Sequence, residues 1–152
     1  MIIERANLHV QNGSAQTYNS NGLGNLNVEY NEANYADVYN RIGSHNLVVG
    51  PEHEYTNYGG MVAGFRNYIL ATSTSAIGGA HNKADRYLSS ISGGSGNTAS
   101  GWYTSISGGS YNTANNSTSS VSGASDNSAS QTGSTISGGY GLDATAYYDH
   151  VP

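Results

Sequence analysis

The sequence predicts an all-β fold, a parallel β-roll or β-solenoid with 15-residue coils, and three observations carry this prediction. Ser-Ile-Ser-Gly-Gly at residues 90–94 returns at 105–109, and related motifs follow at 120–124 and 135–139, always 15 residues apart. Gly, Ser and Asn make up about 40% of the 152 residues, which suits a fold rich in turns. Leu, Ile, Val and Phe together supply about 16%, too little for an ordinary globular core. The step is also too short for helix-pair repeats, so no helix is expected.

Each coil is expected to hold two short strands and two turns, because small or apolar residues alternate with outward serines over residues 89–93. The predicted inward column of larger residues is Met61, Ala76, Ile91, Ile106, Val121 and Ile136. A second inward column is mostly alanine: Ile69, Ala84, Ala99, Ala114, Ala129 and Ala144. The two walls must therefore lie close together, and glycine is needed where backbones approach or φ is positive.

An unbroken asparagine column has the same period and is predicted to form a structural ladder: Asn67, Asn82, Asn97, Asn112 and Asn127. Asparagine tolerates the left-handed conformation of turns, and stacked identical amides can hydrogen-bond to one another. We therefore interpret the Gly-Gly and Asn positions as scaffold and not as a phosphate-binding loop, since no helix follows them.

Along the chain, residues 1–45 are predicted to be an N-terminal cap with irregular first coils, in which residues 1–3 and 8–10 are candidate strands. Residues 46–144 are predicted to be the solenoid repeats. Residues 46–50 fit the pattern with a step of 14, and residues 25–29 fit after an insertion of about seven residues. Residues 145–152 break the pattern and are expected to be a C-terminal tail or interface strand.

Composition excludes several classes of function. Five Lys plus Arg against ten Asp plus Glu argue against a nucleic-acid partner. The absence of Cys removes disulfides and thiolate chemistry. No apolar run reaches the length of a transmembrane segment, and the N-terminus lacks a signal-peptide pattern. We expect a protein made in the cytoplasm or a processed or truncated piece of a longer chain, and no cofactor.

Motifs for metal binding and catalysis are weak. Residues 138–143 match one calcium nonapeptide, but such sites need tandem copies. His53 lies between Glu52 and Glu54, and the other histidines are dispersed, so polar surface or turn roles are expected and no metal site. The less regular half holds the candidate catalytic acids Glu29, Glu32, Asp37, Glu52 and Glu54. A narrow rod offers little concave surface, so the chain is predicted not to be an enzyme.

The aromatic residues, thirteen Tyr with one Trp and one Phe, are the more interesting group. Those predicted to form a ligand-binding or interface surface are Tyr87, Trp102, Tyr103, Tyr111 and Tyr140. Tyr and Trp give large contact area at low entropic cost, so they could bind sugar, protein or matrix. The alternative hypothesis, which we favour, is that these aromatic side chains pack between protomers.

The coils at residues 90–101, S-I-S-G-G-S-G-N-T-A-S-G, and 105–114, S-I-S-G-G-S-Y-N-T-A, resemble the repeats of bacterial surface proteins similar to the YadA-like heads of trimeric autotransporter adhesins. Residues 43–67 and 21–31 look like the blocks that precede such repeats. The resemblance covers about 120 residues. It implies a left-handed roll, a homotrimer and display outside the cell for adhesion.

The expected function is therefore a non-enzymatic extracellular or cell-surface module, structural or adhesive, with a host glycan or matrix ligand. A phage tail-fibre module is a related reading. The main alternative is a self-assembling filament subunit, suggested by the aromatic tail at residues 147–152. An ice-binding solenoid would need a regular threonine array, and Thr98 and Thr113 share a column, but Lys83 and Ser128 flank them.

Overall fold

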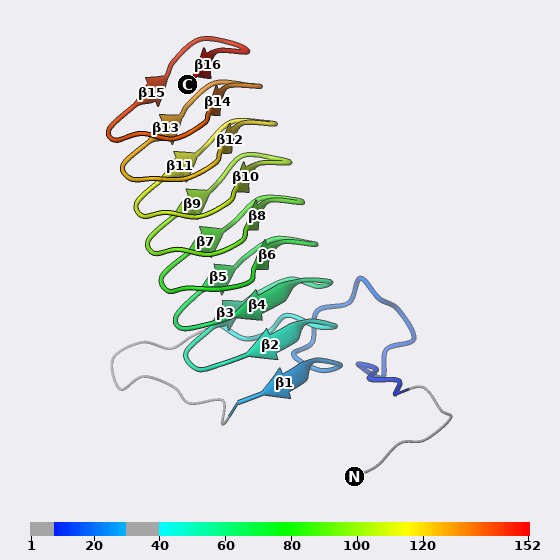
Figure 1. The fold of residues 1–152 in the computed structure, drawn as a ribbon. Coiled ribbons are helices and arrows are strands. Elements are labelled where there is room, and N and C mark those ends of the chain that lie inside the picture. The colour runs from blue at the N-terminus through cyan, green and yellow to red at the C-terminus, as the bar shows by residue number, and fades with distance from the viewer. Residues whose placement is uncertain (1–7, 30–39) are drawn as a thin grey trace.

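A computed structural model describes residues 8–29 and 40–152, and these residues form a β-solenoid without any helix (Figure 1). Successive coils of about 15 residues stack along one axis, roughly 4.8 Å apart. Each regular coil gives one strand to each of two parallel sheets, called sheet A and sheet B. The fold class predicted from the 15-residue period is confirmed.

Sheet A has nine strands within the described ranges, in spatial order β1 (Leu26–Val28), β2 (Leu47–Val49), β4 (Met61–Ala63), β6 (Ser75–Ala76), β8 (Ser90–Ile91), β10 (Ser105–Ile106), β12 (Ser120–Val121), β14 (Thr135–Ile136) and β16 (His150–Val151). Sheet B has seven there, β3 (Glu54–Tyr55), β5 (Tyr68–Ile69), β7 (Lys83–Ala84), β9 (Thr98–Ala99), β11 (Thr113–Ala114), β13 (Ser128–Ala129) and β15 (Asp143–Ala144). A third line of parallel bridges joins Phe65, Ala80, Ser95, Ser110, Ser125 and Tyr140.

The core is a double column of buried side chains between the sheets. Sheet A contributes Val48, Val62, Ala76, Ile91, Ile106, Val121 and Ile136. Sheet B contributes Tyr55, Ile69, Ala84, Ala99, Ala114, Ala129 and Ala144. From β8 onward a branched residue of sheet A therefore faces alanine, whereas Tyr55 and Ile69 place larger side chains on sheet B in the first coils. Buried hydroxyls at the start of the sheet-A strands close the turns, as when Thr104 Oγ1 donates to the carbonyl of Gly101 (2.9 Å).

One column was predicted with the wrong register at its start. Val62, not Met61, pairs with Ala76 and is buried, whereas Met61 pairs with Ser75 and is 42% exposed. The coil step in sheet A is 14 residues at this point, and a shift of one residue moves a side chain to the opposite face of a strand. Between the next strands the step returns to 15, as in the pairing of Ala76 with Ile91.

Strands of sheet A lie on both sides of the predicted repeat range, residues 46–144. Strand β1 pairs with β2 at a step of 21 residues, which is the 14-residue step plus the predicted insertion of seven. Residues 8–10 form no strand, and the candidate strand at residues 1–3 lies outside the described residues. At the other end β16 pairs with β14, so residues 150–151, within the segment expected to be a tail or interface strand, continue sheet A as a strand.

Candidate functional site

An exposed group of aromatic and apolar side chains lies in the turns that lead from sheet B to sheet A. We call it the aromatic edge, and it consists of Tyr87, Leu88, Trp102 and Tyr103. Trp102 is 55% exposed, and the rings of Tyr87 and Tyr103 meet edge to face with centroids 5.8 Å apart. The backbone N–H of Tyr103 donates to the carbonyl of Tyr87 (3.1 Å), so the turn itself sets the stacking of the two coils.

A shallow pocket of about 410 Å³ adjoins the aromatic edge. Its lining comes from three successive coils: Arg86, Ser100, Gly101, Trp102, Asn115, Asn116 and Ser117. The Asn116 amide is held in place because its Nδ2 atom donates to the carbonyl of Ser130 (2.6 Å). An exposed indole beside amides, hydroxyls and a guanidinium combines apolar contact with hydrogen-bonding groups, as polar ligands require.

The structure does not bring all five predicted aromatics together. Tyr111 and Tyr140 lie at a different corner, along the line of bridges, and are 66% and 78% exposed. The ring of Tyr111 covers Gly96, where an added Cβ atom would come within 2.8 Å of it. Three of the five predicted aromatics therefore lie on one surface next to a pocket: Tyr87, Trp102 and Tyr103.

The five asparagines of the repeat column are buried, and each links neighbouring coils mainly through the backbone. For Asn97, the Nδ2 atom donates to the carbonyls of Gly93 (3.1 Å) and Gly109 (3.0 Å), and Oδ1 accepts the N–H of Asn112 (3.0 Å). A direct contact between amides exists from Asn97 Nδ2 to Asn82 Oδ1 (3.1 Å). The column thus satisfies the buried polar groups of the Gly-Gly turns.

His53 occupies the asparagine position of an earlier coil and is fully buried, which corrects the expected role at the surface. Its Nδ1 atom accepts the N–H of Asn67 (3.1 Å), and its Nε2 atom lies 3.0 Å from the carbonyl of Val49. These partners require the neutral ring with hydrogen on Nε2. Burial lowers the pKa of His53 below its ordinary value, although its backbone partners act in the opposite direction.

The candidate catalytic acids do not converge with His53. Glu52 forms an ion pair with Arg66, and Glu54 lies on the outer side of β3, opposite to its inward neighbours His53 and Tyr55. Burial raises the pKa of the Glu54 carboxyl, and Lys83 partly offsets this. Glu32 and Asp37 lie outside the described residues. Among residues 8–29 and 40–152, no three His, Asp or Glu side chains come together as metal ligands.

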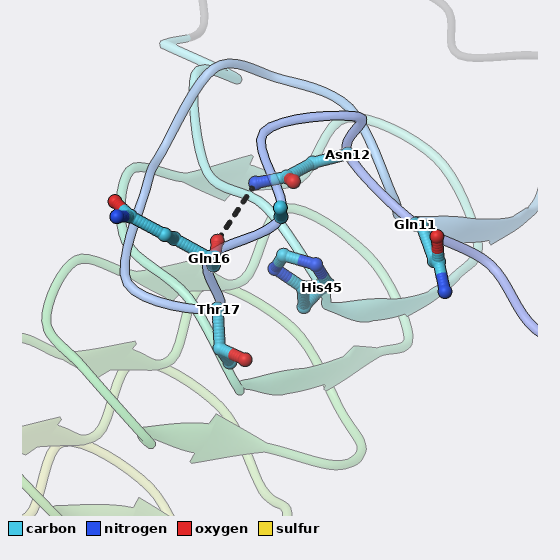
Figure 2. Close-up of a pocket in the computed structure, with 6 residues that line it drawn as sticks. Gln11, Asn12, Gln16, Thr17 and His45 are labelled. Atoms are coloured by element: carbon cyan, nitrogen blue, oxygen red, sulfur yellow. Dashed lines mark hydrogen bonds between the residues drawn. The ribbon is translucent and has the colours of Figure 1, made fainter.

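A second pocket, which the sequence did not indicate, lies at the N-terminal end of the solenoid (Figure 2). It measures about 340 Å³ and is lined by Gln11, Asn12, Ala15, Gln16, Thr17 and His45. Asn12 holds the loop through Nδ2, which donates to the carbonyls of Asn19 (2.7 Å) and Gln16 (3.4 Å). Residues 11–17 follow no repeat, so no periodic signal could have placed them beside His45.

The outer face of sheet A carries an unexpected apolar surface at its N-terminal half. We call it the apolar face, and its exposed members are Leu26, Val28, Val49, Met61 and Ile77. Leu26, Leu47 and Met61 stack in register across β1, β2 and β4. On later strands the same side presents serine and threonine, from Ser90 in β8 to Thr135 in β14. Sequence reasoning missed this face because it placed Met61 in the core.

The threonine array expected of an ice-binding solenoid is short. Thr98 and Thr113 pair in register on the outer side of sheet B, and Lys83 and Ser128 pair with them on either side. The single calcium-like motif ends in Asp143, which is exposed in β15.

Comparison of the chain with protein-family models, curated proteins and solved structures gives no match. None of the described residues forms a helix long and apolar enough to span a membrane.

Proposed function

We propose that this chain is a non-enzymatic adhesive module of an extracellular or cell-surface protein, which binds a host glycan or matrix polymer through its aromatic edge. The observation that carries the proposal is the exposed Trp102 beside a pocket of amide, hydroxyl and guanidinium groups. Hydrogen bonds between successive coils hold these turns in place, which favours binding because groups that are already positioned lose little entropy. The sequence resemblance to adhesin heads supports the same function.

Binding to an array of glycans and matrix polymers tests this function. The protein is expected to bind, and Trp102→Ala is expected to weaken binding at least tenfold, because the ring contact is lost. Tyr140→Ala is the matched control, since Tyr140 is a still more exposed aromatic at another corner. The proposal fails if no ligand is found, or if the two variants weaken binding equally.

We also propose that the module is a homo-oligomer, a trimer as the resemblance implies, in which the apolar face of one copy packs on that of the next. The members of the face are uncharged, and exposed apolar patches of roughly 300–600 Å² are often functional on monomers. Such a patch is smaller than the ~800 Å² per partner of a standard interface. Rotation about an axis parallel to the solenoid brings apolar faces together and also buries the serine-rich half of sheet A, which supplies the remaining area.

Light scattering on the purified chain tests this assembly. The wild type is expected to give a discrete multiple of 15.8 kDa, whereas Val49→Glu with Met61→Glu is expected to give monomer. Thr113→Glu is the control, because Thr113 lies on the outer side of sheet B. A monomeric wild type, or an unchanged mass in the double variant, would reject the proposed interface.

A filament subunit is the second candidate. Strands β15 and β16 pair on one side only within the described chain, so their other edges offer backbone groups to a second copy. This candidate predicts open-ended particles in negative-stain images and a mass that grows with concentration, where the adhesive module predicts one discrete species.

A further inference from the structure

The pocket beside the aromatic edge has an unusual charge environment. Arg86 lines it, and the following residues 87–125 contain no charged residue and no histidine. The nearest charges along the chain neutralise each other, because Lys83 Nζ and Asp85 Oδ2 form an ion pair (2.9 Å). Within the described residues the guanidinium of Arg86 has neither an ion pair nor a hydrogen bond. Although the whole chain has a formal charge of −5, this pocket is locally cationic.

The lining groups are ordered along the solenoid axis. Arg86 belongs to one coil, Ser100 to Trp102 belong to the turn that leads into the next, and Asn115 to Ser117 lie one coil further on. Since coils are stacked about 4.8 Å apart, the site extends roughly 10 Å. It therefore presents, in sequence, a cation, an aromatic face and a set of amides and hydroxyls, over a length that suits two sugar rings.

We infer that the pocket recognises a carboxylated sugar, such as a uronic acid or sialic acid unit of an acidic glycan, and that Arg86 determines this specificity. The planar guanidinium matches a carboxylate with two parallel hydrogen bonds. Trp102 contacts the sugar ring, and Asn115, Asn116 and Ser117 reach its hydroxyls. This inference rests on the proposed function and adds the chemical class of the ligand.

The experiment compares matched acidic and neutral ligands by titration calorimetry on the intact chain. The probes are oligogalacturonate and its methyl ester, and sialyllactose and lactose. The wild type is expected to bind at least one acid about tenfold tighter than its neutral partner. Arg86→Gln is expected to abolish that preference and keep the weaker neutral binding, and Arg86→Lys to keep part of it. Trp102→Ala is expected to weaken binding to both. Thermal unfolding of each variant confirms that it is folded.

The outcomes separate this inference from the function on which it rests. Equal binding of acid and neutral partner, or an acid preference that survives in Arg86→Gln, overturns the carboxylate specificity and leaves glycan adhesion standing. Absence of binding to all four probes also overturns the specificity. Absence of binding on the whole glycan and matrix array overturns adhesion itself.

Discussion

The Nδ1 atom of His53 accepts the backbone N–H of Asn67 at 3.1 Å, and one coil later Asn67 Oδ1 accepts the N–H of Asn82 at 2.9 Å. A histidine ring thus takes the place of an asparagine amide and begins the ladder. The ladder ends where Asn127 Oδ1 accepts the N–H of Leu142 (3.0 Å), because leucine offers no acceptor for a further coil. The ladder therefore runs from one titratable side chain to one apolar side chain.

This substitution predicts that stability falls in mild acid. Burial lowers the pKa of His53, so below the ordinary value near 6.5 the unfolded chain takes up a proton that the folded chain resists. Stability is therefore full above that value and decreases as the pH falls through it. The midpoint of thermal unfolding, measured between pH 7.5 and 5.5, should decrease.

His53→Asn is the matched variant, because it restores the residue found in the next five coils. It should fold and lose most of the acid sensitivity attributed to His53. The interpretation is wrong if the variant shows the same pH dependence as the wild type, since other groups would then cause it.

Asn97→Ala should destabilise the protein by about 2–4 kcal/mol, because it orphans the buried N–H of Asn112 and the carbonyls of Gly93 and Gly109. Asn115→Ala is the control, since Asn115 is exposed on the outer side of sheet B, and it should change stability by less than about 0.5 kcal/mol. Urea denaturation measures both. An equal loss of unfolding free energy in the two variants would show that the hydrogen bonds of the ladder do not stabilise the protein.

Adjacent glycines should respond differently to alanine. Gly94 has φ of +89°, and an added Cβ atom would lie 2.0 Å from the carbonyl oxygen of Gly109, whereas at Gly93 nothing lies within 4 Å. Gly94→Ala should therefore lower the unfolding temperature strongly and Gly93→Ala little. Ala124 occupies the corresponding column with φ of 63°, after a glycine at φ of +157°, so that coil has a different local backbone. A similar loss in both variants would contradict the close approach.

The narrow core predicts that added apolar volume destabilises. Ala99→Ile should cost about 1–3 kcal/mol, because Ala99 faces Ile91 between fully packed walls. Combining it with Ile91→Ala places the isoleucine on sheet B and the alanine on sheet A. Ile69 and Ala76 have this arrangement in an earlier coil. The double variant should be more stable than the sum of the single effects predicts. Strict additivity in urea denaturation would argue that the two positions do not share space.

The regular part of the molecule could be predicted because a strict period reports which residues stack. Ile91, Ile106 and Ile136 follow one another at steps of 15 or its multiple, and each is buried as the pattern requires. Met61 was misplaced because the column was drawn at a constant spacing of 15, whereas this coil has one residue fewer. A shift of one residue moves the side chain from the inner to the outer face of the strand.

Features outside the period needed the structure. His53 was not recognised as a ladder residue, since its likeness to asparagine lies in hydrogen-bonding geometry and not in residue type. Tyr87 and Trp102 are 15 residues apart and were singled out from the sequence, but the pocket beside them combines residues from three coils. The apolar face was identified only from the strand pairing, in which Leu47 pairs with both Leu26 and Met61.

Because the ladder joins each coil only to its neighbours, coils can be added to the solenoid without other changes in sequence. An in-frame duplication of any fifteen consecutive codons in the regular region would insert one complete coil, with its own asparagine, core pair and turns. The new coil would contact the same kinds of side chains and backbone groups on both sides, so the solenoid would lengthen by about 4.8 Å. Natural variants of such a gene should therefore differ in length by whole coils, and each duplication that includes residues 86–100 would copy Arg86 and extend the aromatic edge.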